Sequence, residues 1–210
     1  MSEEHDYTNW NPLPIAEVVE LLSELRAEWW VAGGYAIEMF VDRSIRTHGD
    51  TDILIKRDDQ RIVQEHLSAW QLYHATYPGL KRWRSGEVLT GRHHDIWCRP
   101  DAASSWRLQI MLLDTDGDAW LFRNDPSIRG SIDAMSRATS SGIQYLSPEI
   151  QLLYKAKPNT LEKDQTHFEA AFPLLDEAGR KWLLDNIRKR FPGGHEWTEV
   201  LQASETRSGT

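Results

Sequence analysis

Two glycines and two aspartates in one short stretch are the residues of this sequence best suited to phosphate chemistry. Gly33 and Gly34 follow an apolar run, and Asp50 and Asp52 lead into another. Glycines let a ligand approach the backbone closely, and a helix beginning there offers N–H groups to an anion. Side chains two apart on a strand share a face, so both aspartates should point the same way. Paired carboxylates beside a phosphate cradle predict a magnesium site for nucleotide chemistry.

The elements that must position these residues can be inferred from the same stretch. Trp30–Ala32 is expected to form a short buried strand that leads through the glycine turn into a helix with Ile37 and Phe40 on its buried face. A basic loop follows, and Asp50 and Asp52 begin a second strand. A glycine pair alone often makes only a turn, and Asp-x-Asp alone is often a solvated strand end. Their order favours the functional interpretation.

This order of motifs resembles the nucleotidyltransferase superfamily that includes DNA polymerase beta. The string GGYAIEMF…RSIRTHGDTDI is most similar to the small aminoglycoside nucleotidyltransferases, in particular the 2''-adenylyltransferase group. The resemblance covers about the first half of the chain. It implies that Gly33 and Gly34 lie against the triphosphate of ATP and that Asp50 and Asp52 bind Mg²⁺.

Basic residues on both sides of the expected cleft are candidates for contact with the nucleotide. Arg46 and His48 occupy positions where the resembled family commonly carries basic residues, although a solvated loop is the alternative. Lys155 and Lys157 end a helix that Ser147 and the proline after it should begin. From there they could neutralise phosphate charge, or they could simply favour the helix dipole.

The third carboxylate of the superfamily pattern has no direct counterpart here. A hairpin with arms His93–Arg99 and Trp106–Leu113 is expected next to the Asp-x-Asp strand. Register places Gln109 where the resembled superfamily carries its third acid. Asp95, in the middle of the opposing arm, is the preferred catalytic replacement, because an acid inside a strand is disfavoured unless it is paired or functional. Asp114, which closes the second arm, is the other candidate.

Composition restricts the class of partner. The 210-residue chain carries a net charge of −8, which argues against a long nucleic-acid substrate and is compatible with a small cationic acceptor. No apolar run approaches the roughly 18 residues that a membrane span needs. The polar N-terminus is no secretory signal, and the single cysteine, Cys98, fits a reducing compartment. A cytoplasmic location without membrane partners is therefore expected.

The expected fold class is α+β. Residues 1–141 should form a mixed-sheet nucleotidyltransferase core with flanking helices, and residues 142–210 a C-terminal helical domain. Helices are predicted from Ser147 to about Lys157, at Glu162–Leu175 and at Glu177–Phe191. A helical partner domain behind the core is also what the resemblance implies.

The function implied by the resemblance is Mg²⁺-dependent transfer of a nucleoside monophosphate, AMP from ATP, to a hydroxyl of a small acceptor. An aminoglycoside is one candidate acceptor. Two alternatives remain open: an antitoxin-like adenylyltransferase that modifies a protein hydroxyl, and a degenerate module that binds nucleotide without turnover. Gln109 is the feature that favours the degenerate module.

Overall fold

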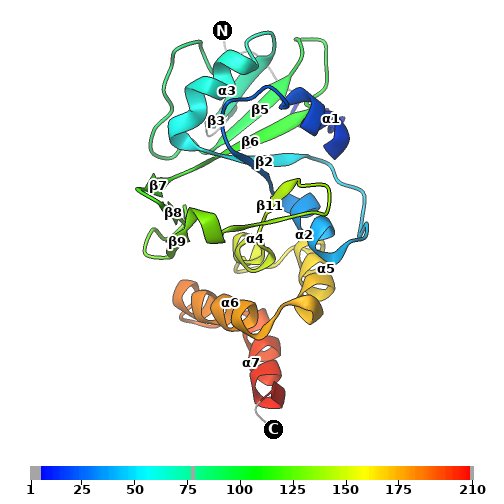
Figure 1. Cartoon of the computed structure of the whole chain (residues 1–210), viewed down its shortest axis with the longest axis vertical. Helices are drawn as coiled ribbons and strands as arrows, with labels where there is room; N and C mark the ends of the chain where they lie inside the picture. Colours follow the sequence, from blue (N-terminus) through cyan, green and yellow to red (C-terminus); the bar gives the residue numbers. More distant parts are fainter. Residues whose placement is uncertain (1–5, 77–78, 209–210) are drawn as a thin grey trace.

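The protein is organised around a central mixed sheet (Figure 1). The computed structural model describes residues 6–76 and 79–208. Over these residues the sheet has eight strands, in the order β10-β11-β1-β2-β6-β5-β3-β4. Strand β2 pairs in parallel with β6 and antiparallel with β1, so the sheet is mixed. In that order, the bounds are Ser136–Ala138, Gln144–Leu146, Trp29–Val31, Asp52–Lys56, Leu108–Leu113, Asp95–Arg99, Gln71–Thr76 and Gly79–Arg82.

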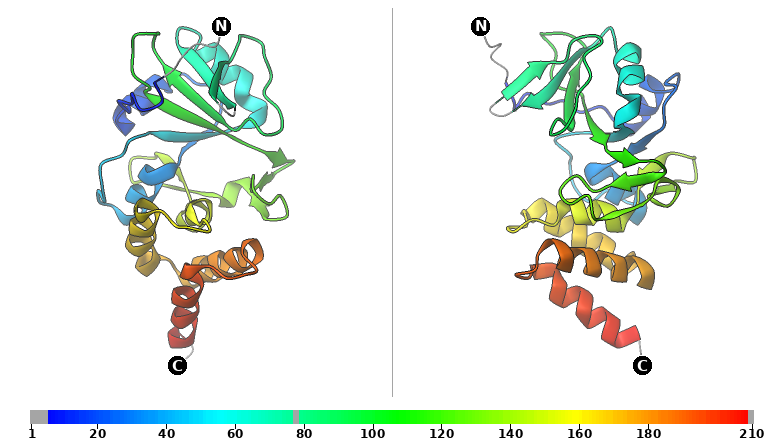
Figure 2. Two further views of the ribbon diagram at one scale, coloured as in Figure 1. Left: turned by 180° about the vertical axis from the view of Figure 1, so that it is seen from behind. Right: turned by 90° about the vertical axis from the view of Figure 1, so that its left-hand side faces the viewer.

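Helices cover both faces of this sheet, and the views in Figures 1 and 2 show most of the helical mass on one side. A small sheet of β7 (Thr115–Asp116), β8 (Ala119–Leu121) and β9 (Arg129–Ser131) extends from the end of β6. The helices are α1 (Ile15–Leu21), α2 (Gly33–Val41), α3 (Gln60–His66), α4 (Pro148–Lys155), α5 (Glu162–Ala171), α6 (Glu177–Arg190) and α7 (Glu196–Ser208).

The alternation of side chains along β2 explains how one strand serves both layers. Ile53 and Ile55 pack into the core beneath α1 and α3, together with Val18 and Val63. Leu54 faces the opposite way, into the core shared with α2 and the C-terminal helices. Asp52 is two residues before Leu54, so its carboxylate emerges on the side of the C-terminal helices.

The predicted fold class is confirmed, and several predicted elements are found close to their expected bounds. The first strand lies one residue earlier than expected, at Trp29–Val31, and the expected hairpin is the antiparallel pair β5–β6. The C-terminal helices begin where predicted, at Pro148, Glu162 and Glu177.

Other expectations were wrong where pairing between distant segments decided the structure. The polar, turn-rich sequence of residues 124–141 predicts a connecting excursion, but this segment contains β9 and β10, because each finds a partner strand elsewhere. The basic stretch that begins at Lys81 and Arg82 predicts an exposed loop, but both residues belong to β4, which pairs with β3. The sequence around His195 and Trp197 predicts only a short final segment, but the thirteen-residue helix α7 begins there.

The predicted boundary near residue 141 does not separate two sheets or cores. Strand β11, which follows it, pairs in parallel with β1 and antiparallel with β10. Trp30 and Ile37 share a hydrophobic core with Leu153 and Leu183 of the C-terminal helices. The division into two domains therefore stays a prediction. None of the helices in the described ranges is long and apolar enough to cross a membrane.

Candidate active site

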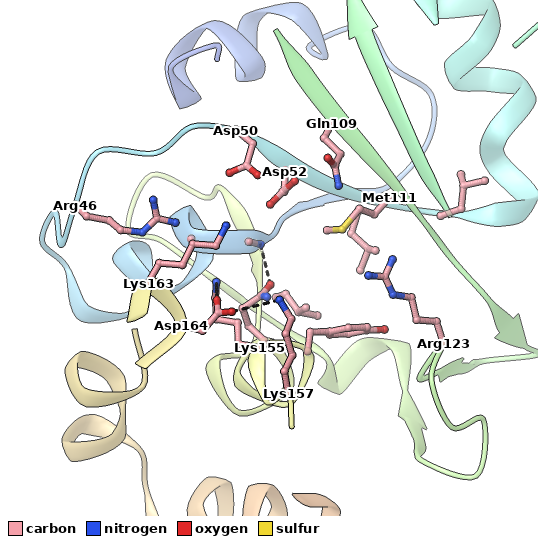
Figure 3. Close-up of a pocket in the computed structure, with 17 residues that line it drawn as sticks. Arg46, Asp50, Asp52, Gln109, Met111, Arg123, Lys155, Lys157, Lys163 and Asp164 are labelled. Atoms are coloured by element: carbon pink, nitrogen blue, oxygen red, sulfur yellow. Dashed lines mark hydrogen bonds and ion pairs between the residues drawn. The ribbon is translucent and has the colours of Figure 1, made fainter. Parts of the chain in front are cut away.

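A pocket between the central sheet and the C-terminal helices brings together most of the residues predicted from the sequence (Figure 3). Strand β2 and the start of α2 supply one wall, β6 and the chain after β8 a second, and α4 with the start of α5 a third. The predicted residues that line it are Gly33, Gly34, Arg46, Asp50, Asp52, Lys155 and Lys157.

The two aspartates share one side of the pocket. Asp52 is the first residue of β2, and Asp50 is two positions earlier. Figure 3 shows both carboxylates pointing into the same space. Oδ1 of Asp52 is enclosed, and the described part of the chain gives it no hydrogen-bond donor. Burial raises the pKa of Asp52 to about 7, with the negative charge of Asp50 adding to the rise and Lys155 opposing it.

The glycine pair is required by close packing against the site. Gly33 has a φ of +66°, and a Cβ there would lie closer than 3.0 Å to Oδ2 of Asp52. A Cβ at Gly34 would meet the His48 ring just as closely. The amide of Gly33 donates to Oε1 of Gln151 at 2.8 Å. This corrects the expectation of unpaired N–H groups at Gly33, because a phosphate could accept from this amide only by displacing Gln151.

His48 and Arg46 face different surroundings, although the sequence suggested the same role for both. Arg46 lines the pocket. His48 lies beneath Gly34 and outside the lining, where its Nε2 is 2.9 Å from Oε1 of Glu38 and its ring stacks on His167 at 5.9 Å. Burial lowers the pKa of His48, and Glu38 opposes that change. His48 is therefore positioned to support the glycine turn.

Lys155 and Lys157 are held together by a buried acid on the next helix. Asp164 accepts hydrogen bonds from Nζ of Lys155 at 3.2 Å and from Nζ of Lys157 at 3.3 Å. Asp164 is 2 % exposed. Burial opposes its ionisation, but the two lysines hold the pKa of Asp164 below its ordinary value. Burial lowers the pKa of Lys155, while Asp164 and Asp52 oppose that change.

The two positions beside Asp52 on the sheet that were considered for the third carboxylate are Gln109 and Asp95. Gln109 is the direct partner of Asp52 across the parallel pair β2–β6, as the predicted register required. Asp95 lies one strand farther, on the same face of the sheet but not among the residues that line the pocket, and its charge contributes to the raised pKa of Asp52. Arg123 donates to Oδ1 of Asp95 at 3.1 Å, and Gln109 donates to the same oxygen at 3.4 Å.

Asp114 is committed to a different part of the fold. Its carboxylate accepts from the Arg57 guanidinium, and the His94 Nδ1 lies 3.5 Å from Oδ2. Arg57 also donates to the carbonyl of His93 at 2.7 Å. These contacts fasten the loop before β5 to the start of α3, and Asp114 is not among the residues that line the pocket.

Three further charged residues line the pocket, Arg123, Lys163 and Asp164, and none of them was assigned to the site from the sequence. Lys163 and Asp164 lie at the start of α5, six or more residues beyond Lys157. Their proximity to the two earlier lysines could have suggested a shared cluster. A single arginine after β8 offers no local signal, because Arg123 reaches Asp95 only through the tertiary return of the chain.

The chemistry available to this pocket is anion binding beside a pair of hard oxygen ligands. Among the described lining residues, Arg46, Arg123, Lys155, Lys157 and Lys163 are basic, and Asp50, Asp52 and Asp164 are acidic. No cluster of three or more His, Cys, Asp or Glu suited to a metal occurs in the described ranges. Asp50 and Asp52 could thus supply only part of a coordination shell, with other oxygens coming from a phosphate or water.

Comparison with known proteins points to the family that the sequence resembles. A family model described as aminoglycoside-2''-adenylyltransferase matches residues 14–133, over half of the chain. No curated protein sequence matches.

Solved structures show the same fold at low sequence identity. The lincomycin-bound lincosamide antibiotic adenylyltransferase LnuA is 14 % identical with a TM-score of 0.54, covering 77 % of this chain and 96 % of its own. The solution structure of the antibiotic-resistance factor ANT(2'')-Ia is 12 % identical with a TM-score of 0.56, covering 85 % and 91 %. Its crystal structure with adenylyl-2''-tobramycin is 12 % identical with a TM-score of 0.54, covering 84 % and 96 %.

Proposed function

The chain belongs to the aminoglycoside-2''-adenylyltransferase family and is a nucleotidyltransferase, and on that premise we propose that it transfers AMP from ATP to a hydroxyl of a small acceptor. One observation carries this proposal. Asp50 and Asp52 share one side of a pocket whose other lining residues are rich in lysine and arginine. Such a pocket matches a polyanionic nucleotide accompanied by a divalent cation.

The buried surroundings of Asp52 support the assignment of Mg²⁺ to the two aspartates. Its Oδ1 is enclosed without a hydrogen-bond donor, and its pKa is raised to about 7. A buried oxygen of this kind is costly unless a proton or a cation compensates it. We therefore assign Asp50 and Asp52 as the Mg²⁺ ligands. When bound there, the metal would stabilise negative charge on the reacting phosphate.

The basic side chains are assigned to the triphosphate. Arg46, from the loop before β2, and Lys163, from the start of α5, lie on one side of the pocket (Figure 3). Lys155, the last residue of α4, and Lys157, just after it, lie on another. Ammonium and guanidinium groups bind phosphate oxygens through charge-assisted hydrogen bonds. Gly33 and Gly34 line the same pocket, and their missing side chains let Asp52 and the His48 ring pack directly against the backbone at the start of α2.

The proposed reaction is a displacement at the α-phosphorus of ATP. The acceptor oxygen forms a bond to that phosphorus, the bond to the bridging oxygen of the β-phosphate breaks, and pyrophosphate leaves. The proton of the acceptor hydroxyl must go to a base. We assign this role to the carboxylate of Asp95, which is on the pocket face of the sheet and close enough to influence Asp52.

The decisive test is pyrophosphate release from ATP in the presence of Mg²⁺ and a panel of hydroxylated acceptors. Replacing Asp50 or Asp52 with Ala should abolish release, and unchanged release would disprove the metal assignment. Thermal-shift titration with ATP and Mg²⁺ provides a second readout, because a ligand that binds only the folded state stabilises it. The wild-type protein should be stabilised by the pair of ligands and the Asp52→Ala variant should not.

A second candidate function is nucleotide binding without turnover, favoured by one observation. The neighbour of Asp52 on β6 is Gln109, an amide that cannot remove a proton or contribute a negative charge to a metal. Stabilisation by ATP and Mg²⁺ without pyrophosphate release across the acceptor panel would support this alternative. Acceptor-dependent release would exclude it.

A further inference from the structure

We infer that the side chain of Gln151, on α4, binds the triphosphate of the nucleotide by donating its amide N–H to a phosphate oxygen. This inference rests on the proposed nucleotidyl transfer and concerns how the triphosphate is held. Gln151 lies four positions before Lys155, and both residues line the pocket. Residues four apart on a helix share a face, so α4 presents an amide and an ammonium to the pocket one turn apart.

The backbone amide of Gly33 determines which way round the Gln151 amide lies. A backbone N–H can only donate, and the Gly33 N–H donates to Oε1 of Gln151 at 2.8 Å. A glutamine amide has one acceptor end and one donor end, joined at the same carbon. With its oxygen held by Gly33, the side chain of Gln151 must turn its nitrogen away from the glycine turn.

The nitrogen of Gln151 lacks the partner that its counterparts have. Three glutamines are buried within the described ranges, Gln60, Gln64 and Gln151, and Gln151 is 5 % exposed. Gln60 and Gln64 each accept from a backbone N–H at 2.7 Å and donate from Nε2 to a backbone carbonyl, at 2.9 Å and 2.7 Å. Nε2 of Gln151 donates to no group of the described chain. A buried donor left in this state is costly unless a ligand or water accepts from it.

The unpaired nitrogen of Gln151 is open to the pocket. It is not among the unpartnered side-chain atoms that the described chain encloses completely. Because Gln151 is almost fully buried and lines the pocket, the accessible part of its amide faces the space where a ligand would lie. The side chain is thus held at its oxygen end and offers N–H at the other.

The charges around the pocket favour an anionic oxygen as the partner of this N–H. The basic residues that line the pocket are Arg46, Arg123, Lys155, Lys157 and Lys163. Hydrogen bonds to ionised acceptors are about twice as strong as those between neutral groups, so a phosphate oxygen drawn in by these cations is the strongest acceptor available. Oδ1 of Asp52, the enclosed carboxylate oxygen of the pocket, accepts from no donor in the described chain.

This arrangement gives the glycine turn an indirect role in binding phosphate. In a direct cradle the Gly33 N–H would itself donate to the ligand. Here its hydrogen bond orients Gln151, and the amide of Gln151 donates in its place. Hydrogen bonds in a chain polarise one another, so the bond from Gly33 should strengthen the donor that the ligand meets.

Nitrogen-15 NMR of the intact protein observes the side-chain N–H groups of Gln151 directly. The resonance pair that is missing from the spectrum of Gln151→Met belongs to Gln151, and Gln64→Met assigns the matched control in the same way. On saturation with a non-hydrolysable ATP analogue and Mg²⁺, one proton of the Gln151 pair should shift downfield, because it gains an anionic acceptor, and the Gln64 pair should stay in place. An unmoved Gln151 pair would overturn the inference.

Inorganic tripolyphosphate with Mg²⁺ identifies which part of the nucleotide accepts. It carries the phosphates without the nucleoside, so it should shift the same Gln151 proton. A shift seen with the ATP analogue alone would assign the contact to the nucleoside and would also overturn the inference.

Calorimetry with the same ATP analogue and Mg²⁺ separates this inference from the proposed function. Failure of the wild type to bind would count against nucleotidyl transfer itself. If the wild type binds, Gln151→Met, which is neutral, and Gln151→Glu, which keeps an acceptor for Gly33, should each raise Kd at least about tenfold, equivalent to about 1.4 kcal/mol. Gln64→Met should change Kd by a factor of about two or less.

The two Gln151 variants fail in different ways if the donor is unimportant. A raised Kd for Gln151→Met alone would mean that Gln151 only supports Gly33. A raised Kd for Gln151→Glu alone would mean that the added negative charge is the whole effect. Either result, or an unchanged Kd in both variants, would overturn the inference.

Discussion

Gly33 and Asp52 are packed so closely that no other residue type fits at position 33. A Cβ built there would lie closer than 3.0 Å to Oδ2 of Asp52, and the backbone has a φ of +66°. The glycine is required twice, once by the left-handed conformation and once by the neighbouring carboxylate. The start of α2 and the start of β2 therefore form one rigid unit that fixes the position of Asp52.

Gly33→Ala should abolish pyrophosphate release, because the new methyl group must displace the Asp52 carboxylate. Gly142→Ala is the matched control: it has a similar positive φ, but nothing lies within 4 Å of its Cβ position. Both variants should lose about 1–2 kcal/mol of unfolding free energy from backbone strain. Urea denaturation and activity assays check this pair, and an active Gly33→Ala variant would contradict it.

The pH dependence of stability should show the titration of the buried Asp52 carboxylate. Its pKa is raised to about 7 in the folded protein, so the folded state binds the proton more tightly than the unfolded state does. The resulting stability is fully present below the unfolded value of about 3.8 and is lost as pH rises through about 7. Without metal, the Tm of the wild type should fall relative to that of Asp52→Asn between about pH 5 and about pH 8.

Mg²⁺ provides the control for that prediction. Added at about pH 8, it should raise the Tm of the wild type and leave that of Asp52→Asn unchanged, because a ligand of the folded state stabilises it. Asp118→Asn, at an exposed turn, should follow the wild-type profile under both conditions. Parallel Tm profiles for the wild type and Asp52→Asn would show that the buried carboxylate is compensated in some other way.

Asp95→Asn tests the assigned base. The amide preserves the shape of the side chain but cannot accept the hydroxyl proton, so kcat should fall by a factor of about 10²–10⁴. The KM for ATP should stay within a few-fold, because Arg123 and the lysines remain. Asp116→Asn removes a comparable acid–arginine pair at the surface and should leave kcat unchanged. A kcat for Asp95→Asn close to that of the wild type would reject the assignment.

Gln109→Asp should restore a third acid beside the pair. The new carboxylate would stand directly across from Asp52 on β6. Calorimetric titration with Mg²⁺ should show affinity higher by about tenfold, since an added anionic oxygen ligand favours the metal. In metal-free protein the like charge should raise the pKa of Asp52 further and lower Tm at about pH 8. Unchanged metal affinity would mean that position 109 lies outside the coordination shell.

The sequence was sufficient to predict those parts of the site that depend on local order. Glycines after a buried strand and acids at the start of the next one define their own geometry, because strand alternation fixes the side on which Asp50 and Asp52 emerge. The same rule correctly placed Gln109 opposite Asp52, once the hairpin was recognised. The starts of helices α4, α5 and α6 carry local signals: α4 has Pro148 in its first turn, α5 has two acids there, and α6 is capped by Asp176.

The remaining parts depend on contacts between distant segments, which leave no local pattern. Arg123, two residues after β8, donates to Asp95 on β5, and Gln151 on α4 accepts from Gly33. His48 and Arg46 are two apart in an irregular loop, where strand alternation does not apply, and they face different surroundings. Strands β9 and β10 are three residues each, so their partners rather than their own sequences define them.

Asp164→Asn should weaken nucleotide binding and stability together. Asp164 accepts from Lys155 and Lys157, and without its charge the buried ammonium of Lys155 loses its nearest carboxylate. Loss of a buried hydrogen bond to a charged group costs about 1.5–3 kcal/mol, whereas the exposed control Asp185→Asn, which breaks the Lys181 pair, should cost about 0.5 kcal/mol or less.

The direction in which the pKa of Asp164 is shifted determines how the Asp164→Asn effect on stability depends on pH. The folded pKa of Asp164 is depressed, so its contribution is present above the unfolded value of about 3.8 and is lost as pH falls through the folded value. Urea denaturation should therefore show the largest difference from the wild type near neutral pH and a shrinking one in acid. Calorimetry should show a Kd for the ATP analogue raised about tenfold, because Lys155 and Lys157 lose the group that positions them. An unchanged Kd with reduced stability would assign Asp164 a purely structural role.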